Sequence, residues 1–302
     1  MKRLGYKEIR KSLHKIASVF VGGIYKIFCK IGLFTPKVVV YVDGGICSQM
    51  HQYLIGQLYA IQGKKVFYDL NWFKVCGRDV DGKYERVYEL ETAFPSLNVV
   101  SINPFEGWFY RMFLCYTSLD HKLPEICLPP IYLGGYYGLP HVDFVNLFKR
   151  SFLDDFVKIK QCSNELRCAI HVRRGDLAKG DNLYYGGTAD SYFFNAIAYV
   201  KKHYTNVIFY FFSDEMSYVS EQLLPRLSDL KYELVMSNKA YEDLFLIAGC
   251  DVIIASQGTF GRFAAMFNEK SLLILKTEPD ELYGKYRVDW SARKKNVVYI
   301  DE

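Results

Sequence analysis

The residues best suited to chemistry are two adjacent arginines that follow an apolar run. Residues 168–172 (Cys-Ala-Ile-His-Val) have the pattern of a buried strand, and Arg173-Arg174-Gly175-Asp176 comes directly after it. In open α/β sheets, ligands bind beyond the carboxyl ends of such strands. A guanidinium group stays protonated and matches phosphate oxygens with two parallel hydrogen bonds. The segment therefore predicts that one or both arginines bind an anion such as a diphosphate.

Two simpler roles for this pair stay open. One arginine could form a salt bridge with Asp176 or another carboxylate and only hold a loop in place. Arg174-Gly175-Asp176 also has the sequence of an adhesion tripeptide, but its position directly after a buried strand disfavours that role.

Strands and helices are expected to alternate through the second half of the chain, which indicates a parallel, doubly wound sheet. The expected strands lie at 168–172, 207–212, 232–236 and 251–255, and the expected helices at 191–203, 216–227, 241–248 and 260–267.

A second anion-binding element is predicted where the 251–255 strand meets the next helix. Ser256, Gln257, Gly258 and Thr259 form this turn. Small hydroxyl residues and a glycine there offer backbone N–H groups and a positive helix end to an anion. Ser256 or Thr259 could also cap the helix, and that role is compatible with phosphate binding.

The first half opens with a strand, a glycine turn and a helix. The β-branched run 38–42 is followed by Asp43-Gly44-Gly45, and apolar residues then recur at helical spacing before a second strand at 65–69. This is the start of a βαβ unit. A dinucleotide site is disfavoured, because the glycine pattern Gly-x-Gly-x-x-Gly is absent. Residues 72–130 are irregular and aromatic, with prolines that interrupt helices, and are expected to form loops facing an acceptor.

Several segments resemble motifs of the α-1,2-fucosyltransferases of the bacterial type. Residues 171–176 match their His-x-Arg-Arg-x-Asp motif, whose His-x-Arg-Arg core also appears in α-1,6-fucosyltransferases. Residues 243–260 resemble the family stretch that ends in a Ser-Ser-Phe turn, although Ser256-Gln257 is nearer the α-1,6 branch. Residues 131–137 are similar to the family's Leu-x-Gly-Tyr-[Phe/Trp]-Gln segment.

The glycine turn resembles the family's early Gly-Gly-Leu-Gly-Asn-Gln-[Met/Leu]-Phe-Gln-Tyr motif. Matching residues are Gly44, Gly45, Gln49, Met50, Gln52 and Tyr53, and departures are Ile46, Cys47, Ser48 and His51. The resemblance implies that Gln49, His51 and Gln52 bind the acceptor. The departures change how closely a backbone can approach the turn, which leaves the acceptor and the transferred sugar open.

The resemblance implies an α/β fold of the GT-B type, with two Rossmann-like domains facing across a cleft. An N-terminal segment (1–36) would precede an acceptor-side domain (37–155) and a nucleotide-sugar-binding domain (156–302). The implied reaction is inverting transfer of L-fucose from GDP-β-L-fucose to a glycan hydroxyl, the 2-OH of a galactoside, in the synthesis of a bacterial surface polysaccharide such as O-antigen. The alternatives are a transferase of another GDP-linked or deoxy sugar, or a non-catalytic glycan-binding module.

By the same resemblance, Arg173 binds the β-phosphate and Arg174 makes a supporting contact or a salt bridge. His171 is placed beside the guanine or the ribose, with a packed strand histidine as the alternative. The N1 and N2 hydrogens of guanine need an acceptor, for which Asp214 and Asn238, each after a strand, are equal candidates.

An acceptor hydroxyl must also lose its proton, and a nearby carboxylate is the usual base. Asp176 is the first candidate and Asp181 the second. No cofactor or metal is expected, because the second half lacks an Asp-x-Asp pair and arginines can carry the diphosphate charge.

Composition limits the other classes of function. The 302 residues carry a net charge of +5, and much of this excess lies in the first thirty residues, so a nucleic-acid partner is not expected. The eight cysteines form no Cys-x-x-Cys pair, which favours a reducing compartment and disfavours zinc.

Residues 1–30 have the pattern of a basic amphipathic helix. Their apolar run is about ten residues long, short of the roughly 20 that a membrane-spanning helix needs. One hypothesis is an interfacial helix that holds a cytoplasmic enzyme against the anionic inner face of the cytoplasmic membrane. The alternative is a helix packed on its own domain with a solvated basic face.

Overall fold

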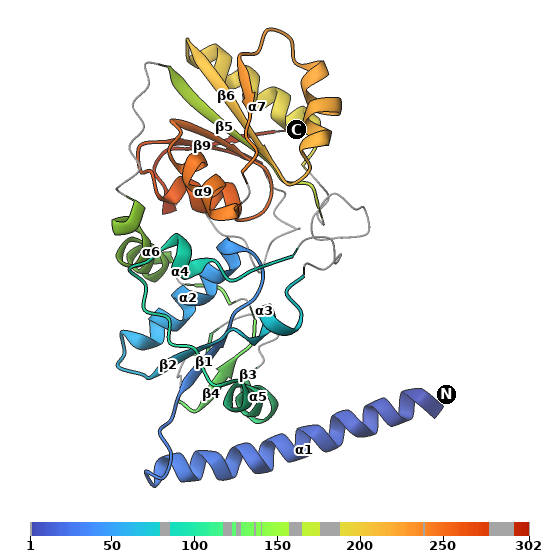
Figure 1. Cartoon of the computed structure of the whole chain (residues 1–302), viewed down its shortest axis with the longest axis vertical. Helices are drawn as coiled ribbons and strands as arrows, with labels where there is room; N and C mark the ends of the chain where they lie inside the picture. Colours follow the sequence, from blue (N-terminus) through green and yellow to red (C-terminus); the bar gives the residue numbers. More distant parts are fainter. Residues whose placement is uncertain are drawn as a thin grey trace. The chain divides into compact units, whose positions relative to one another are not determined.

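The computed structural model describes residues 2–78, 85–116, 123–124, 128–135, 137–139, 141–156, 165–175, 188–237, 239–277 and 293–301. The described residues form two compact units, one extending to Phe148 and the other beginning at Lys149 (Figure 1). This division falls inside helix α6 (His141–Phe156). The boundary expected from the sequence, between residues 155 and 156, lies at the end of the same helix.

The first unit contains a four-stranded parallel sheet with the order β2-β1-β4-β3. Its strands are β1 (Val38–Tyr41), β2 (Val66–Asp69), β3 (Cys115–Tyr116) and β4 (Ile131–Leu133). The three consecutive valines of β1 are completely buried, as expected for a central strand covered on both faces. Helix α2 (Ile46–Ala60) packs on β1 and β2.

Residues 72–130 are more regular than their composition predicts. They include α4 (Leu90–Ala93) and α5 (Pro104–Phe113), and α3 (Asn71–Val75) overlaps their start. Pro104 does not interrupt a helix but begins one, because the first helical position needs no amide hydrogen. Asn103 Oδ1 caps this helix by accepting a hydrogen bond from Phe105 N at 2.9 Å.

The second unit contains a six-stranded parallel sheet with the order β10-β9-β8-β5-β6-β7. Its strands are β5 (Leu166–Val172), β6 (Val207–Ser213), β7 (Tyr232–Leu234), β8 (Val252–Ala255), β9 (Leu272–Lys276) and β10 (Val297–Ile300). The chain moves outward from β5 to β7 and then returns to place β8 on the other side of β5. The topological switch point of this doubly wound sheet therefore lies between β5 and β8.

The helices of the second unit largely follow the predicted pattern, with α7 (Asp190–His203), α9 (Ala240–Ala248) and α10 (Phe260–Met266). The predicted helix 216–227 is broken into α8 (Met216–Tyr218), a π-helical turn (Val219–Leu223) and a 3-10 turn (Leu224–Arg226). Pro225 explains part of this break, because its ring excludes the regular hydrogen bond to the carbonyl four residues earlier. The two-sheet, parallel α/β architecture is confirmed, and how the two units face each other stays a prediction.

Helix α1 (Lys2–Lys30) packs along α5 through its second half (Figure 1). Ser18 Oγ donates a hydrogen bond to the Met112 carbonyl at 2.9 Å, and the Tyr25 and Tyr110 hydroxyls lie 3.3 Å apart. The structure thus shows the alternative role for this segment, which is a helix packed on its own domain. Among the described residues, no helix combines the length and apolar character required to span a bilayer.

Tyr192 of α7 connects the core of the second unit to two neighbouring strands. Its hydroxyl is buried and lies 2.9 Å from both the Ala255 carbonyl of β8 and the Ile274 carbonyl of β9. The ring packs in the same apolar cluster as Ile170 and Phe211. This contact fixes the carboxyl end of β8, where the predicted anion-binding turn begins.

We expect Tyr192→Phe to lower the free energy of unfolding by about 1–2 kcal/mol, because two buried carbonyls lose their shared side-chain donor. Urea unfolding with circular dichroism would measure the change. Tyr199→Phe, on the same helix but outside this pair of contacts, is the control. Equal stability of the two variants would contradict a role for the Tyr192 hydroxyl in holding β8.

Candidate functional site

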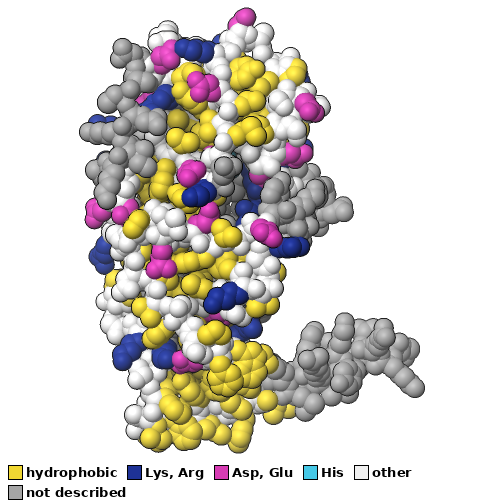
Figure 2. Space-filling view, viewed as in Figure 1, with side chains coloured by type: hydrophobic (Ala, Val, Ile, Leu, Met, Phe, Trp, Pro, Cys, Tyr) yellow, Lys and Arg dark blue, Asp and Glu magenta, His cyan; other side chains and the backbone are white. Residues whose placement is uncertain are grey.

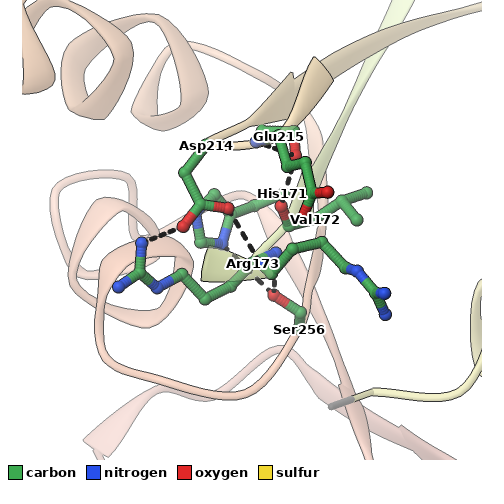
Figure 3. Close-up of polar contacts among 8 residues, drawn as sticks. His171, Val172, Arg173, Asp214, Glu215 and Ser256 are labelled. Atoms are coloured by element: carbon green, nitrogen blue, oxygen red, sulfur yellow. Dashed lines mark hydrogen bonds and ion pairs between the residues drawn. The ribbon is translucent and has the colours of Figure 1, made fainter. Parts of the chain in front are cut away.

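The site is built around the Arg173 side chain, which forms an ion pair with Asp214 (Figure 3). Arg173 follows β5 and Asp214 follows β6, and these two strands are paired in parallel register up to Val172 and Ser213. The other carboxylate oxygen, Asp214 Oδ1, accepts the Arg174 backbone N–H at 2.8 Å. Asp214 thus binds both the side chain of one arginine and the backbone of the next.

A second strand end fixes the same backbone from the opposite side. Ser256, directly after β8, is buried, and its Oγ accepts the Arg173 backbone N–H at 2.8 Å (Figure 3). Its own N–H donates to the His171 carbonyl at 3.1 Å. Residues from β5, β6 and β8 therefore meet at the switch point, and they position Arg173 there.

His171 is buried at the end of β5 and packs rather than projecting outward. Its ring stacks on Phe260 with centroids 5.0 Å apart, and Nδ1 lies 3.5 Å from Ser256 Oγ. Burial, and secondarily the positive charge of Arg173, lower the pKa of His171 to about 3. The imidazole is therefore neutral near pH 7. Its placement beside guanine or ribose stays a prediction.

Arg174 takes a different environment from Arg173. The centre of its guanidinium lies 3.8 Å from the centroid of the Tyr218 ring, a cation–π geometry. The Tyr218 hydroxyl donates to Asp190, and Asp190 also accepts a 2.6 Å bond from Arg226. Arg174 Nε is buried and has no hydrogen-bond partner among the residues that the structure describes. The supporting contact predicted for Arg174 is thus made with an aromatic ring.

The turn after β8 is only partly open to a ligand. The Gln257 N–H donates to Thr188 Oγ1 at 3.1 Å, and both residues are buried, so the backbone N–H groups of Ser256 and Gln257 are already used. Gly258 has a positive φ of 97°, and Thr259 is exposed. Any anion at this turn would meet Gly258 and Thr259 first.

Three predicted site residues lie outside the described part of the chain. They are Asn238, one of two candidates for guanine, and the two candidate bases Asp176 and Asp181. Their roles stay predictions. The structure uses Asp214, the other guanine candidate, as the partner of Arg173, and this pairing is the salt bridge to another carboxylate that the sequence left open.

In the first unit, Gln49 and Gln52 are completely buried and hold the glycine turn. Gln52 accepts the Asp43 N–H at 2.9 Å and donates to Asp43 Oδ1 at 2.6 Å. Gln49 donates to the carbonyls of Gly44 and Val87 and accepts the N–H of Glu89. Direct contact with an acceptor would require this network to open.

His51 is more accessible than the two glutamines but is also engaged. It is half-buried, and its Nε2 donates to the Tyr137 carbonyl at 2.8 Å. The structure therefore gives the motif a role in shaping the turn, and binding of an acceptor by these three residues stays a prediction.

Comparison with known proteins connects this geometry to a family. The family model described as "Glycosyl transferase family 11" matches residues 148–301, about half of the chain, including the whole Arg173–Asp214–Ser256 site. The chain belongs to glycosyl transferase family 11. The predicted relationship to the fucosyltransferases of this family is confirmed, and the protein is a glycosyltransferase.

Among similar proteins, an alpha-1,2-colitosyltransferase of Escherichia coli is 21% identical to this chain over 269 residues. The matched region covers 78% of this chain and 89% of the relative. Among solved structures, it is similar to the E. coli heptosyltransferase WaaC with ADP, at 9% identity and TM-score 0.44, with 88% and 93% of the two chains covered. It is also similar to E. coli ADP-heptose lps heptosyltransferase II, at 12% identity and TM-score 0.40, with 87% and 90% covered.

Sequence reasoning missed three residues that support the family 11 site. Tyr218 lies beneath Arg174, Asp190 binds the Tyr218 hydroxyl, and Thr188 binds the turn after β8. Asp190 gave one signal, an acidic residue directly before the helix predicted at 191–203, and it lies in the first turn of α7. No sequence pattern marks Tyr218, because its ring reaches Arg174 only once β5 and β6 are neighbours.

We expect Asp214→Asn to reduce kcat roughly tenfold to a hundredfold, because Arg173 loses the carboxylate that orients it. Steady-state turnover and the thermal midpoint would be compared with those of Glu215→Gln, an exposed neighbour. A raised KM for the donor with unchanged kcat would instead indicate that Asp214 binds guanine. Turnover equal to that of the control would exclude both roles.

The buried neutral His171 also predicts a pH dependence of stability. Its folded-state pKa of about 3 lies below the ordinary value of 6.5, so between these values the unfolded chain binds more protons and stability falls as pH decreases. The slope from this group is at most about 1.4 kcal/mol per pH unit. His171→Gln should have a shallower stability profile between pH 6.5 and pH 4 by urea unfolding. Parallel profiles would show that His171 is not held neutral.

Proposed function

We propose that this family 11 enzyme transfers L-fucose from GDP-β-L-fucose to the 2-OH of a galactoside in a glycan, with inversion at the anomeric carbon. The observation that carries the proposal is the Arg173 guanidinium, held by Asp214 at the switch point between β5 and β8. Doubly wound sheets bind nucleotides at this place. The α-1,2 linkage is supported by the relative, which is named an alpha-1,2-colitosyltransferase.

The reaction forms a bond between the acceptor oxygen and the anomeric carbon of the sugar. The bond from that carbon to the β-phosphate oxygen breaks, and its electron pair passes to GDP. Negative charge then grows on the diphosphate, where a preorganised guanidinium stabilises it more in the transition state than in the ground state. We assign this role to Arg173, and Asp176 or Asp181 accepts the hydroxyl proton.

Arg174 and the turn after β8 supply further donors in this proposal. The buried Nε of Arg174 is without a partner among the described residues, and the Tyr218 ring fixes the plane of the guanidinium. Gly258 and Thr259 offer the accessible backbone of the turn. His171 stays neutral, so it adds no charge to the site, and its proposed place is beside the nucleoside.

The proposed transfer requires neither a metal nor a cofactor, and GDP-fucose acts as the donor substrate. Arg173 and Arg174 provide two positive charges for the diphosphate, and Asp214 is the carboxylate that pairs with Arg173 in the described part of the chain. Among the described residues, no group of three His, Cys, Asp or Glu side chains is arranged to hold a metal ion.

A second candidate is a transferase of another GDP-linked or deoxy sugar on the same scaffold. The name of the E. coli relative specifies colitose, and not fucose, as the transferred sugar. The family motif is also altered at Ile46, Cys47 and Ser48, beside the glycine turn. A non-catalytic glycan-binding module would bind a glycan and release no GDP.

For the cellular setting, we propose synthesis of a bacterial surface polysaccharide such as O-antigen at the inner face of the cytoplasmic membrane. The partners are then a GDP-sugar donor and an oligosaccharide or lipid-linked glycan acceptor, and no nucleic acid. The basic composition of residues 1–30 supports contact with an anionic membrane surface.

The purified enzyme would be tested for release of GDP or UDP from a panel of nucleotide sugars with galactoside acceptors, with and without EDTA. We expect GDP release from GDP-fucose that persists in EDTA. Arg173→Lys should lose roughly 10²-fold in kcat, because lysine cannot form two parallel bonds to phosphate. Arg78→Lys, exposed in the first unit, is the control.

If the enzyme prefers another GDP-sugar, that sugar would replace fucose in the proposal, and the proposed donor site would stay the same. More than about tenfold loss in EDTA, restored by Mg²⁺ or Mn²⁺, would assign the diphosphate charge to a metal. Full turnover by Arg173→Lys would remove the donor site from this place.

A further inference from the structure

Helix α1 has two different faces. The inner face carries Ser18, Gly22 and Tyr25, which contact α5. A Cβ at Gly22 would lie 2.4 Å from the Phe113 carbonyl oxygen, so the close approach of the two helices depends on this glycine. The outer face has large apolar side chains at helical spacing that are exposed, namely Ile16, Val19, Phe20, Ile24, Ile27 and Phe28.

The exposed stripe continues past the end of α1 and onto α5. Ile31, Leu33 and Phe34 follow the helix and are exposed, and on α5 so are Phe105 and Trp108. Ring contacts with centroids 5.1–6.1 Å apart connect these segments in an unbroken series, in the order Phe28, Phe34, Tyr25, Phe109, Phe113, Trp108 and Phe105. Figure 2 shows the hydrophobic side chains gathered where α1 meets α5.

We call this the α1–α5 surface and define it by the outer face of α1, residues 31–34, Phe105 and Trp108. A contiguous exposed apolar surface of this kind on a protein marks a site of interaction. The question is which partner covers it.

Charge decides between the two main candidate partners, which are a second copy of the chain and an anionic bilayer. Residues 1–30 contain eight Lys and Arg and one acidic residue, whereas the other 272 contain 30 Lys and Arg against 32 Asp and Glu, from totals of 38 and 33. A second copy joined through α1 would place two such basic segments together. An anionic bilayer instead attracts the basic segment and accepts the apolar side chains, including interfacial aromatics.

We propose that the α1–α5 surface is a membrane-binding surface that inserts its apolar side chains into the interface of an anionic phospholipid bilayer. Helix α1 then lies in the plane of the interface, and α5 and residues 31–34 enter beside it. The inference deepens the membrane location in the proposed function and rests on it for the biological setting. It differs from binding by the basic helix alone, because α5 belongs to the folded unit and must also reach the lipid.

The first test is co-sedimentation of the full chain with phosphatidylcholine vesicles that contain phosphatidylglycerol. We expect binding that weakens as salt rises, and a loss of about tenfold or more in affinity for Leu33→Glu/Phe105→Glu, which removes two apolar contacts. These side chains are 65% and 74% exposed, so the fold should tolerate both changes. Val75→Glu/Met236→Glu is the matched control, at 78% and 81% exposed.

The second test uses Trp108 as a reporter of insertion. The variant Trp72→Phe/Trp290→Phe leaves it as the only tryptophan of the chain. Vesicles with brominated acyl chains should quench its emission and shift it to shorter wavelength. Binding without either change would show that α1 acts alone and would overturn the proposal.

Three other results are decisive. Equal vesicle binding by both double variants would overturn the α1–α5 surface. Dimers in analytical ultracentrifugation that Leu33→Glu/Phe105→Glu abolishes, without vesicle binding by the wild type, would assign the surface to a second copy. GDP release with a water-soluble acceptor is measured in parallel. The two proposals can fail separately. Normal turnover without vesicle binding would overturn the membrane-binding surface and leave the donor site in place.

Discussion

The site depends on one constraint, which is the register that makes neighbouring parallel strands end at the same edge of the sheet. β5 is in register with β6 and with β8, so His171 lies opposite Phe212 on one side and Ala255 on the other. The residues that follow these strands, distant in sequence, therefore meet at one edge of the sheet. Asp214 and Ser256 bind Arg173 from the two sides. A shift of either register would separate the three side chains.

The charges at this edge are arranged so that two arginines can stand side by side. Asp214 offsets one of them, and the Tyr218 ring provides an electron-rich surface for the other. A protonated histidine next to them would add a third positive charge, but burial keeps His171 neutral. The described groups in contact with the arginine pair thus leave an excess of positive charge, which an incoming diphosphate can neutralise. In the proposed donor site, this positive charge would attract the diphosphate of the donor.

The sequence predicts the strands of this site well and its contacts poorly, for a physical reason. Apolar runs identify β5, β6 and β8, and chemistry identifies the arginine pair, because both are local properties. The partner of Arg173 depends on which strands are neighbours, and a local pattern left Asp214 equally suited to guanine. Gln49 and Gln52 show the same limit in the first unit, because a polar side chain in a motif suggests contact with ligand until its burial is known.

Helix α1 shows why two sequence hypotheses can both describe one segment. Periodicity marks apolar positions on a helix, but it does not reveal which of two faces the protein covers. Close contact with α5 requires small side chains, and Gly22 and Ser18 supply them. The large side chains are consequently turned outward, where water makes their exposure unfavourable. Packing on the domain and binding to a bilayer are therefore complementary, because the first presents the face that the second would bury.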